Sequence, residues 1–368
     1  MSESSWYGLK DPSAIPTPAL LVYEERLNRN LRTMIDVARS PAKLRPHVKT
    51  HKMAAVMARQ LALGITRFKC ATIAEVEMAA AAGAPDVLLA YQPVGPNIGR
   101  LASLRNTFPG TKLSVIVDDA DAVRALNAAW SRGRLELLVD IDVGQHRTGV
   151  RSVADAIALY QVIGESAHLA AGGLHVYDGH ITQSDVDERR AASDAAFEIV
   201  QTVRAKLSAL SLDVPKIVAG GTPTFPFHAA RQDVECSPGT TVFWDASYAE
   251  KVPDLPFIPA ALVLSRVISK PSTGLLCLDL GHKAIASEMP HPRVEFLNVA
   301  ATKCITHSEE HMVIEAPDAD RFAVGDCVYG IPWHICPTVA LHSEALVIDH
   351  GEVTARWTVT ARNRRITI

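Results

Sequence analysis

Short apolar segments alternate with longer amphipathic segments through the first two thirds of the chain. The apolar segments are rich in β-branched residues, as buried strands are, and the intervening stretches, such as DERRAASDAAFEIVQTVRAKLSAL, have helical periodicity. Strands that are apolar throughout and are each followed by a helix predict a parallel sheet covered on both faces. Eight such units in about 200 residues favour a (β/α)8 TIM-type barrel over an open sheet. The predicted strands lie at residues 44–50, 67–72, 86–91, 113–119, 135–143, 172–179, 216–222 and 233–240.

The pattern changes after about residue 255, where short alternating strands are separated by turn residues and few helical stretches remain. This pattern predicts an appended antiparallel β domain. One further strand, at residues 18–25, precedes the barrel and is expected to join that domain. We therefore expect a barrel over residues 26–255 and a β domain made of residues 1–25 and 256–368.

Composition and charge exclude several classes of function. The 368 residues carry a formal net charge of -3, so we expect no binding of nucleic acid or of an anionic membrane. No apolar run reaches the roughly 18 residues of a membrane helix, and the first residues lack the pattern of a secretory signal. The six cysteines are scattered without a CxxC pair, which is typical of a reducing compartment, so a cytoplasmic protein is expected.

Polar residues at the ends of the predicted barrel strands indicate where chemistry takes place, because strand ends and the loops after them build the site in such barrels. The first strand, in LRPHVKTHK, ends with His47 and Lys49. Two glycine/threonine turns follow the last two strands and suit a phosphate, whose oxygens bare N–H groups and hydroxyls can approach. A strand-end lysine and a phosphate site together fit pyridoxal phosphate, whose aldehyde bonds to a lysine amine. The two turns are Gly220-Gly221-Thr222 and Gly239-Thr240.

Each of these signals is weak by itself. Taken alone, a lysine at a strand end is better explained by exposure to solvent, and Gly-Gly-Thr is usually only a tight turn. Arg147 follows the fifth strand and Tyr177 the sixth, but a lone arginine or tyrosine there more often packs or forms hydrogen bonds than catalyses.

The β domain contains a candidate metal pair in YGIPWHICPTVALH. His334 and Cys336 are expected on an extended segment, where alternation would point both side chains to one side. Imidazole and thiolate suit Zn²⁺, although two residues alone favour a buried cysteine beside a hydrogen-bonded histidine. An incomplete ligand set finished by water and substrate would suit a Lewis acid. In THSEEHMVIEA, His311 is the better functional candidate, while a solvated acidic turn explains the two glutamates equally well.

The order of these motifs resembles that of the fold-type III pyridoxal-phosphate enzymes, in the D-threonine aldolase / D-serine dehydratase family. LRPHVKTHK resembles the family's Arg-Pro-His-x-Lys-x-His-Lys motif, and CATIAEVEMAAAAGAPDVLLAY, VDIDVGQHRTGV, AGGLHVYDGH and VAGGTPTF follow in the family's order. The resemblance implies an alanine racemase-like barrel with a C-terminal β domain. It implies that Lys49 holds the cofactor beside His47, that Arg147 and Tyr177 contact it, and that the Gly-Gly-Thr turn holds its phosphate.

The resemblance also implies a divalent metal on His334 and Cys336, in contact with the β-hydroxyl of the substrate. The family carries His-x-Asp or His-x-Cys here, and the cysteine of this chain favours dehydration and zinc, with manganese and magnesium as alternatives. His311 lies in a segment similar to the family's Asp-Glu-His segment near the metal and is therefore a catalytic candidate.

We accordingly expect a lyase whose small-molecule substrate is a D-3-hydroxy-amino acid. The favoured reaction is D-serine dehydratase-like β-elimination to a 2-oxo acid and ammonia. The alternatives are retro-aldol cleavage to glycine and an aldehyde, an amino-acid racemase on the same fold, and a cofactor-carrying protein without activity. A homodimer is expected, because relatives complete each active site with residues of the partner subunit.

Overall fold

The computed structural model describes residues 6–368, and the chain divides into two packed units. The barrel unit comprises Met34–Lys49, Ala54–Gly239 and Asn363–Ile368. The β unit comprises the chain up to Thr33, Thr50–Met53 and Thr240–Arg362. Helix α1 (Glu24–Ala38) runs from one unit into the other.

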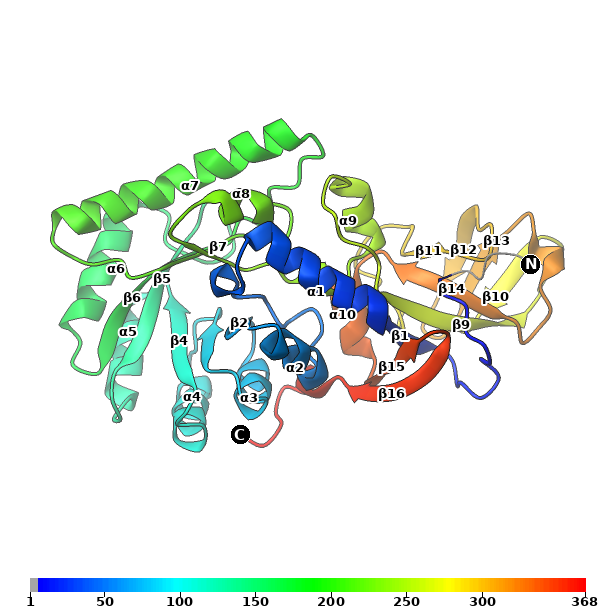
Figure 1. Cartoon of the computed structure of the whole chain (residues 1–368), viewed down its shortest axis with the longest axis horizontal. Helices are drawn as coiled ribbons and strands as arrows, with labels where there is room; N and C mark the ends of the chain where they lie inside the picture. Colours follow the sequence, from blue (N-terminus) through cyan, green and yellow to red (C-terminus); the bar gives the residue numbers. More distant parts are fainter. Residues whose placement is uncertain (1–5) are drawn as a thin grey trace. The chain divides into compact units, whose positions relative to one another are not determined.

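The barrel unit is built on seven parallel strands in sequence order, each paired with the next. Helices follow the strands and lie outside the curved sheet (Figure 1). The strands are β2 (Arg67–Cys70), β3 (Asp86–Leu89), β4 (Lys112–Val117), β5 (Leu135–Ile141), β6 (Leu169–Val176), β7 (Ile217–Ala219) and β8 (Val234–Cys236). The helices are α2 (Ala54–Ala62), α3 (Ile73–Ala81), α4 (Pro96–Thr107), α5 (Ala120–Ala129), α6 (Val153–Glu165), α7 (Val186–Ala209) and α8 (Phe225–Ala230).

Several barrel helices begin at a capping side chain that comes shortly after a strand. Thr72, two residues beyond β2, accepts the Glu75 amide at the start of α3. Asp119, two residues beyond β4, accepts the Ala122 amide at the start of α5. Such caps satisfy amides that have no partner inside the helix, and they fix where each strand ends and its helix begins.

The predicted first strand, residues 44–50, is not a regular strand, and this part of the prediction is wrong. Leu44 bridges to Cys236 in β8, and His47 bridges to Lys69 in β2, both in parallel. The ladder is broken between them because Pro46 has no amide hydrogen to donate. Residues 44–48 therefore join the two edge strands as an irregular seam and close the ring of the sheet.

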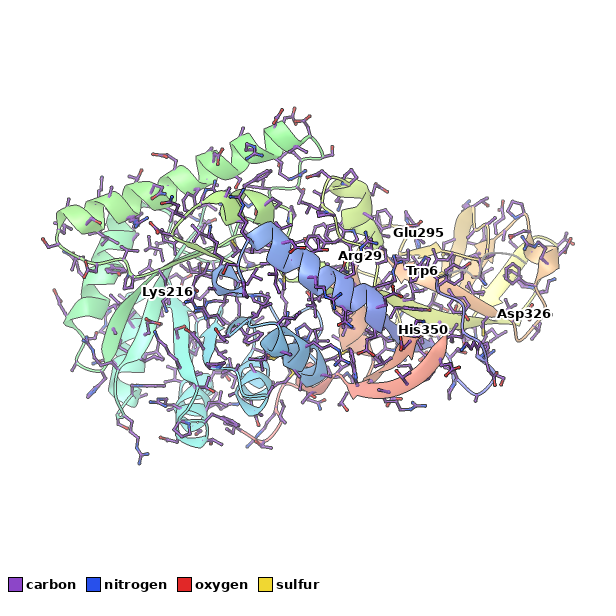
Figure 2. The ribbon with its side chains drawn as sticks, in the orientation of Figure 1. Trp6, Arg29, Lys216, Glu295, Asp326 and His350 are labelled. Atoms are coloured by element: carbon purple, nitrogen blue, oxygen red, sulfur yellow. The ribbon has the colours of Figure 1, made fainter. Side chains whose placement is uncertain are left out.

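Charged residues toward the amino ends of the strands are joined in ion pairs. Lys216, labelled in Figure 2, precedes β7, and its amine lies 2.6 Å from Glu136 in β5. The buried guanidinium of Arg45 lies 2.7 Å from Asp86 in β3 and 2.6 Å from Glu235 in β8. In barrels of this kind the amino end of the sheet serves stability.

We expect Arg45→Met to destabilise the barrel by about 3 kcal/mol, because two partly buried carboxylates would lose their cation. Burial raises the pKa of Asp86, but the nearby Arg45 guanidinium lowers it by more, so the pKa lies below the usual value for an aspartate. The stabilisation from this pair is therefore present at neutral pH and is lost as the pH falls below about 4. Urea unfolding at several pH values measures both effects.

The matched control is Arg124→Met. The ion pair of Arg124 with Asp121 is exposed on helix α5, so its loss should change the free energy of unfolding by less than about 1 kcal/mol. An equal effect of both substitutions would contradict the role assigned to Arg45.

The β unit is built on a sheet with the strand order β12-β13-β10-β9-β1-β15-β16, in which β14 pairs with β9 and with β11. Strand β1 (Ala19–Tyr23) is antiparallel to β9 and parallel to β15, which confirms that the N-terminal strand joins this sheet. All other strand pairs are antiparallel. These strands are β9 (Ala261–Ser269), β10 (Leu275–Leu278), β11 (Val294–Phe296), β12 (Lys303–His307), β13 (Met312–Glu315), β14 (Cys327–Pro332), β15 (Glu344–Asp349) and β16 (Glu352–Thr358).

Two short helices belong to the β unit: α9 (Ala246–Lys251) and α10 (Ile335–Leu341). Five of the six cysteines lie in strands, in or beside the cores, and all six are free thiols. Within residues 6–368, no helix has the length and apolar character needed to span a bilayer.

Candidate active site

Four of the predicted cofactor residues come together in the barrel unit. Lys49 lies in the turn that follows the seam, and its Nζ is 5.5 Å from the centre of the Tyr177 ring. The guanidinium carbon of Arg147 is 5.0 Å from the same ring centre. His47 is buried, and its Nδ1 accepts the Lys49 amide at 3.3 Å. The sequence motif thus places the lysine beside an arginine and a tyrosine from the ends of two other strands.

Glycines determine where the Tyr177 ring can lie. A Cβ atom on Gly179 would stand 2.1 Å from the Tyr177 hydroxyl, closer than any side chain tolerates. A Cβ atom on Gly221 would stand 3.4 Å from the ring. The ring therefore lies against two bare backbone segments, and a larger residue at 179 would push it away from Lys49.

The Gly-Gly-Thr turn is held by hydrogen bonds within the protein. Gly220 has a φ of 90°, in the left-handed region that favours glycine. Its amide donates to Val176, and the Gly221 amide donates to the Asp178 carboxylate at 2.8 Å. The Gly239 amide donates to the Thr222 hydroxyl at 3.2 Å. These three amides already have acceptors within the protein, so the turn is ordered by its own hydrogen bonds, and its phosphate contacts stay a prediction.

Asp178 organises this turn, and the sequence analysis missed it. Its carboxylate also accepts the Thr224 hydroxyl at 2.8 Å and lies 2.7 Å from His228 Nε2. Burial raises the pKa of Asp178, but His228, Thr224 and the Gly221 amide together hold it below the usual value. Asp178 is therefore an anion whose charge is satisfied within the barrel. Its place between Tyr177 and Gly179 at a strand end was the available signal.

A second buried network lies on β5 and β6. His175 Nδ1 is 2.6 Å from Asp140, which also accepts the Thr148 hydroxyl at 2.9 Å. Burial raises the pKa of Asp140, but His175 and Thr148 lower it below the usual value, so this carboxylate is ionised. Burial and the nearby Lys69 lower the pKa of His175, so the imidazole is neutral and donates from Nδ1.

The predicted metal pair lies in the β unit, but not on an extended segment as expected. Strand β14 ends at Pro332, His334 is the N-cap residue of α10, and Cys336 lies in the first turn of that helix. The buried Asp245 carboxylate accepts the Ile335 amide at 3.1 Å and so satisfies a donor at the start of α10. This local bonding explains why a helix replaces the predicted extended segment. The Cys336 thiol is 3.2 Å from the Thr50 hydroxyl and 3.6 Å from that of Thr240.

The surroundings of His334 fit a metal ligand. Its Nδ1 is hydrogen-bonded to Glu288, a residue that the sequence analysis missed, and its imidazole also has a side-chain hydrogen bond with Cys336. Metal-binding histidines commonly donate their second N–H to a carboxylate in this way. Burial lowers the pKa of His334, but Cys336, Glu288 and Asp245 raise it to about 9. Surroundings that favour a proton here also favour a divalent cation.

The described part of the chain contains no group of three His, Cys, Asp or Glu side chains arranged to hold a metal ion. The metal role of His334 and Cys336 therefore stays a prediction. His311, the remaining catalytic candidate, is exposed between β12 and β13, and its carbonyl accepts the Ser308 amide.

Comparison with known proteins places the chain in a family. A model for the alanine racemase N-terminal domain matches residues 22–246, and one for a putative serine dehydratase domain matches residues 260–348. A D-threonine aldolase of an Arthrobacter species is 32% identical, covering 96% of this chain and 94% of the relative. A 3-hydroxy-D-aspartate aldolase of Paracoccus denitrificans is 30% identical over the same shares. A D-threo-3-hydroxyaspartate dehydratase of a Delftia species is 33% identical, over 63% of this chain and 62% of that protein.

The fold agrees with these relatives. The crystal structure of D-threonine aldolase from Filomicrobium marinum matches with a TM-score of 0.83 and 31% identity, covering 94% of this chain and 96% of that one. The predicted fold class, a barrel with an appended β domain, is confirmed. The chain therefore belongs to the D-threonine aldolase / D-serine dehydratase family of fold-type III pyridoxal-phosphate lyases.

Proposed function

We propose that this lyase eliminates water from D-3-hydroxy-amino acids and gives a 2-oxo acid and ammonia. The reaction would use a divalent metal ion, with zinc as the favoured metal. The observation that carries this proposal is the pair of His334 and Cys336, held at the start of α10 with Glu288 on the second imidazole nitrogen. The relatives act on D-threonine and 3-hydroxy-D-aspartate by name, which supports a D-3-hydroxy-amino acid as substrate.

The barrel residues have roles that follow from their positions. Pyridoxal phosphate, when bound, withdraws electrons from the α-carbon of an amino acid. The Lys49 amine is the group that anchors it, and after release this amine accepts the α-proton of the substrate. Tyr177 and Arg147 would orient what Lys49 contacts, since the centre of the Tyr177 ring lies 5.5 Å from the Lys49 amine and 5.0 Å from the Arg147 guanidinium carbon. Asp178 holds the Gly221 turn rigid beneath the ring.

The metal pair has a separate role at the β-carbon of the substrate. A divalent cation supplies Lewis-acid assistance to the departing hydroxyl group. His334 and Cys336 would hold that cation, and Glu288, hydrogen-bonded to Nδ1 of His334, would orient the imidazole for it. A softer thiolate ligand at this position favours zinc over magnesium. His311 remains a candidate for proton transfer to the leaving oxygen.

Retro-aldol cleavage is the second candidate, and a specific observation favours it. A D-threonine aldolase and two 3-hydroxy-D-aspartate aldolases match 96% of this chain at 28% to 32% identity. A D-threo-3-hydroxyaspartate dehydratase matches 63% of it, and a D-serine dehydratase matches 92% of it at only 24% identity. The same residues would then promote cleavage of the Cα–Cβ bond, since a cation bound to the β-oxygen would also favour loss of the hydroxyl proton.

Product analysis separates these reactions. With D-threonine we expect 2-oxobutyrate and ammonia to exceed acetaldehyde and glycine, and with D-serine we expect pyruvate. The L-enantiomers serve as controls and should not react. Acetaldehyde and glycine as the main products would establish the aldolase. Racemisation of D-serine that survives exhaustive chelation, without either set of products, would overturn the lyase proposal in favour of a racemase.

We further propose a cytoplasmic homodimer. The resemblance to enzymes with shared active sites supports the dimer, and the six free thiols support a reducing compartment. Light scattering after gel filtration should give about twice the 39.7 kDa mass of the chain.

A further inference from the structure

A second lysine points into the barrel beside Lys49. Lys69 is the third residue of β2, and its side chain is buried, with 2% exposure. Its Nζ lies 5.7 Å from the centre of the Tyr177 ring, which is also the ring nearest to Lys49 and Arg147. Among residues 6–368, this buried amine has no hydrogen-bond partner. A buried amine in this condition is costly unless something binds it.

His175 has a buried acceptor atom that likewise lacks a hydrogen-bond partner among the described residues. Its Nδ1 donates to Asp140, so its Nε2 carries a lone pair, and this atom too is buried and has no partner in the part of the chain that the structure describes. Lys69 and His175 are close enough for the charge of one to lower the pKa of the other. The barrel interior therefore offers both an unsatisfied donor and an unsatisfied acceptor, as ligand sites do and packed cores do not.

The charges around Lys69 favour an added anion. Burial and the nearby Lys49 and Arg147 lower the pKa of Lys69 to about 7, and the two carboxylates that raise it are already bound to other groups. Asp140 is engaged by His175 and Thr148, and Asp178 by His228 and Gly221. No nearby carboxylate pairs directly with Lys69, so an incoming anionic oxygen would be the first to do so.

We propose that Lys69 binds an anionic oxygen inside the barrel, carried either by the pyridoxal-phosphate ring or by the carboxylate of the substrate. The Lys69 ammonium has three donors, which is enough to hold such an oxygen and to use the His175 acceptor as well. This inference rests on the proposed function, because the oxygen belongs to the cofactor or substrate of the same site. The proposal adds Lys69 of β2 to the residues already described, which are Lys49, Arg147 and Tyr177.

The test compares Lys69→Met, which keeps the volume and removes the charge, with Lys69→Arg, which keeps the charge at every accessible pH. Cofactor-free protein is titrated with pyridoxal 5'-phosphate and binding is followed by absorbance, and KM and kcat are then measured with D-threonine. Lys112→Met is the matched control, because Lys112 is an exposed lysine on the next strand but one and pairs with Glu136. Thermal unfolding checks that each variant is folded.

If the ring of the cofactor carries the oxygen, Lys69→Met should weaken cofactor binding by about 10-fold or more, the usual effect of losing a hydrogen bond to a charged group. If the substrate carries it, cofactor affinity should be unchanged and KM should rise by about the same factor. In the wild-type protein, the affinity for whichever molecule carries the oxygen should fall as the pH rises above about 7, since the unliganded Lys69 loses its proton there. Lys69→Arg should not show this fall. The charged and titratable groups near Lys69 are Lys49, Arg147, Asp140, Asp178 and His175, and the Tyr177 ring lies beside it.

Two results would overturn the inference. One is a folded Lys69→Met protein whose cofactor affinity and KM both match those of wild type and of Lys112→Met. The other is a Lys69→Arg protein that behaves like Lys69→Met, because that would make volume rather than charge decisive. Failure of the proposed function is recognised separately, since wild-type protein would then form no 2-oxo acid or aldehyde from any D-3-hydroxy-amino acid.

Discussion

Replacement of Lys49 by alanine should abolish the yellow absorbance that pyridoxal phosphate acquires when it bonds to a lysine amine. The same change should reduce kcat by about 10³-fold or more, because it removes both the anchor of the cofactor and the base for the α-proton. Lys49 is the lysine whose amine lies over the Tyr177 ring at the end of the seam. The absorbance spectrum and single-turnover kinetics of purified protein measure the two losses.

Lys52→Ala is the matched control, because Lys52 belongs to the same motif and its carbonyl accepts the Ala361 amide in the β unit. This variant should keep the yellow absorbance. An alanine at 49 that leaves the absorbance intact would contradict the assignment, and mass spectrometry after borohydride reduction would then identify the lysine that carries the cofactor.

Removal of the metal should have the second largest effect. Exhaustive chelation, or Cys336→Ala, should lower the rate of product formation by about 100-fold or more, because Lewis-acid assistance is worth several kcal/mol in the transition state. The yellow absorbance should stay, since the proposed metal ligands are distinct from Lys49. Zn²⁺ should restore the chelated wild-type enzyme better than Mn²⁺ or Mg²⁺, whereas Cys336→Ala should recover only in part.

Cys304→Ala controls for loss of a thiol, because Cys304 is partly exposed on β12 and belongs to no proposed ligand set. It should remain as active as wild type. Glu288→Gln tests the orientation of His334 and should weaken metal binding by about 10-fold to 100-fold. Full activity in chelated protein would remove the metal from the mechanism.

Repetitive features of the chain were predictable because they recur over many residues. Seven of the eight predicted barrel strands coincide with β2 to β8, since a strand buried on both faces gives a long apolar run. The irregular seam was not predictable, because LRPHVKT has the alternation of a strand. Pro46 interrupts the hydrogen bonding, and only isolated bridges to β2 and β8 form. Periodicity alone does not report that kind of interruption.

The candidate site was predictable where residues follow a strand end in a motif, as Lys49, Arg147 and Tyr177 do. Lys69 and Glu288 were not found because their roles depend on partners distant in sequence, whereas Asp178 was missed although it stands beside Tyr177 at a strand end. Lys69 lies in β2 and belongs to no motif, so only its burial and its distance to the Tyr177 ring mark it as part of the site. His334 and Cys336 stay a predicted metal pair, but the extended conformation expected there was wrong, because the Asp245 carboxylate accepts an amide at the start of α10.

The seam has a consequence for how the enzyme assembles during folding. Leu44 and Cys236 meet in the ring although about 190 residues separate them along the chain, so this contact closes a very long loop. Contacts of such high sequence separation form late, after the local strand–helix units. Lys49 follows directly on this late contact, so we expect a nascent chain to gain its cofactor-binding lysine geometry only in the last stage of folding. Cofactor present at that moment would stabilise the closed ring by mass action, and cofactor supply in the cell would then set the yield of folded enzyme.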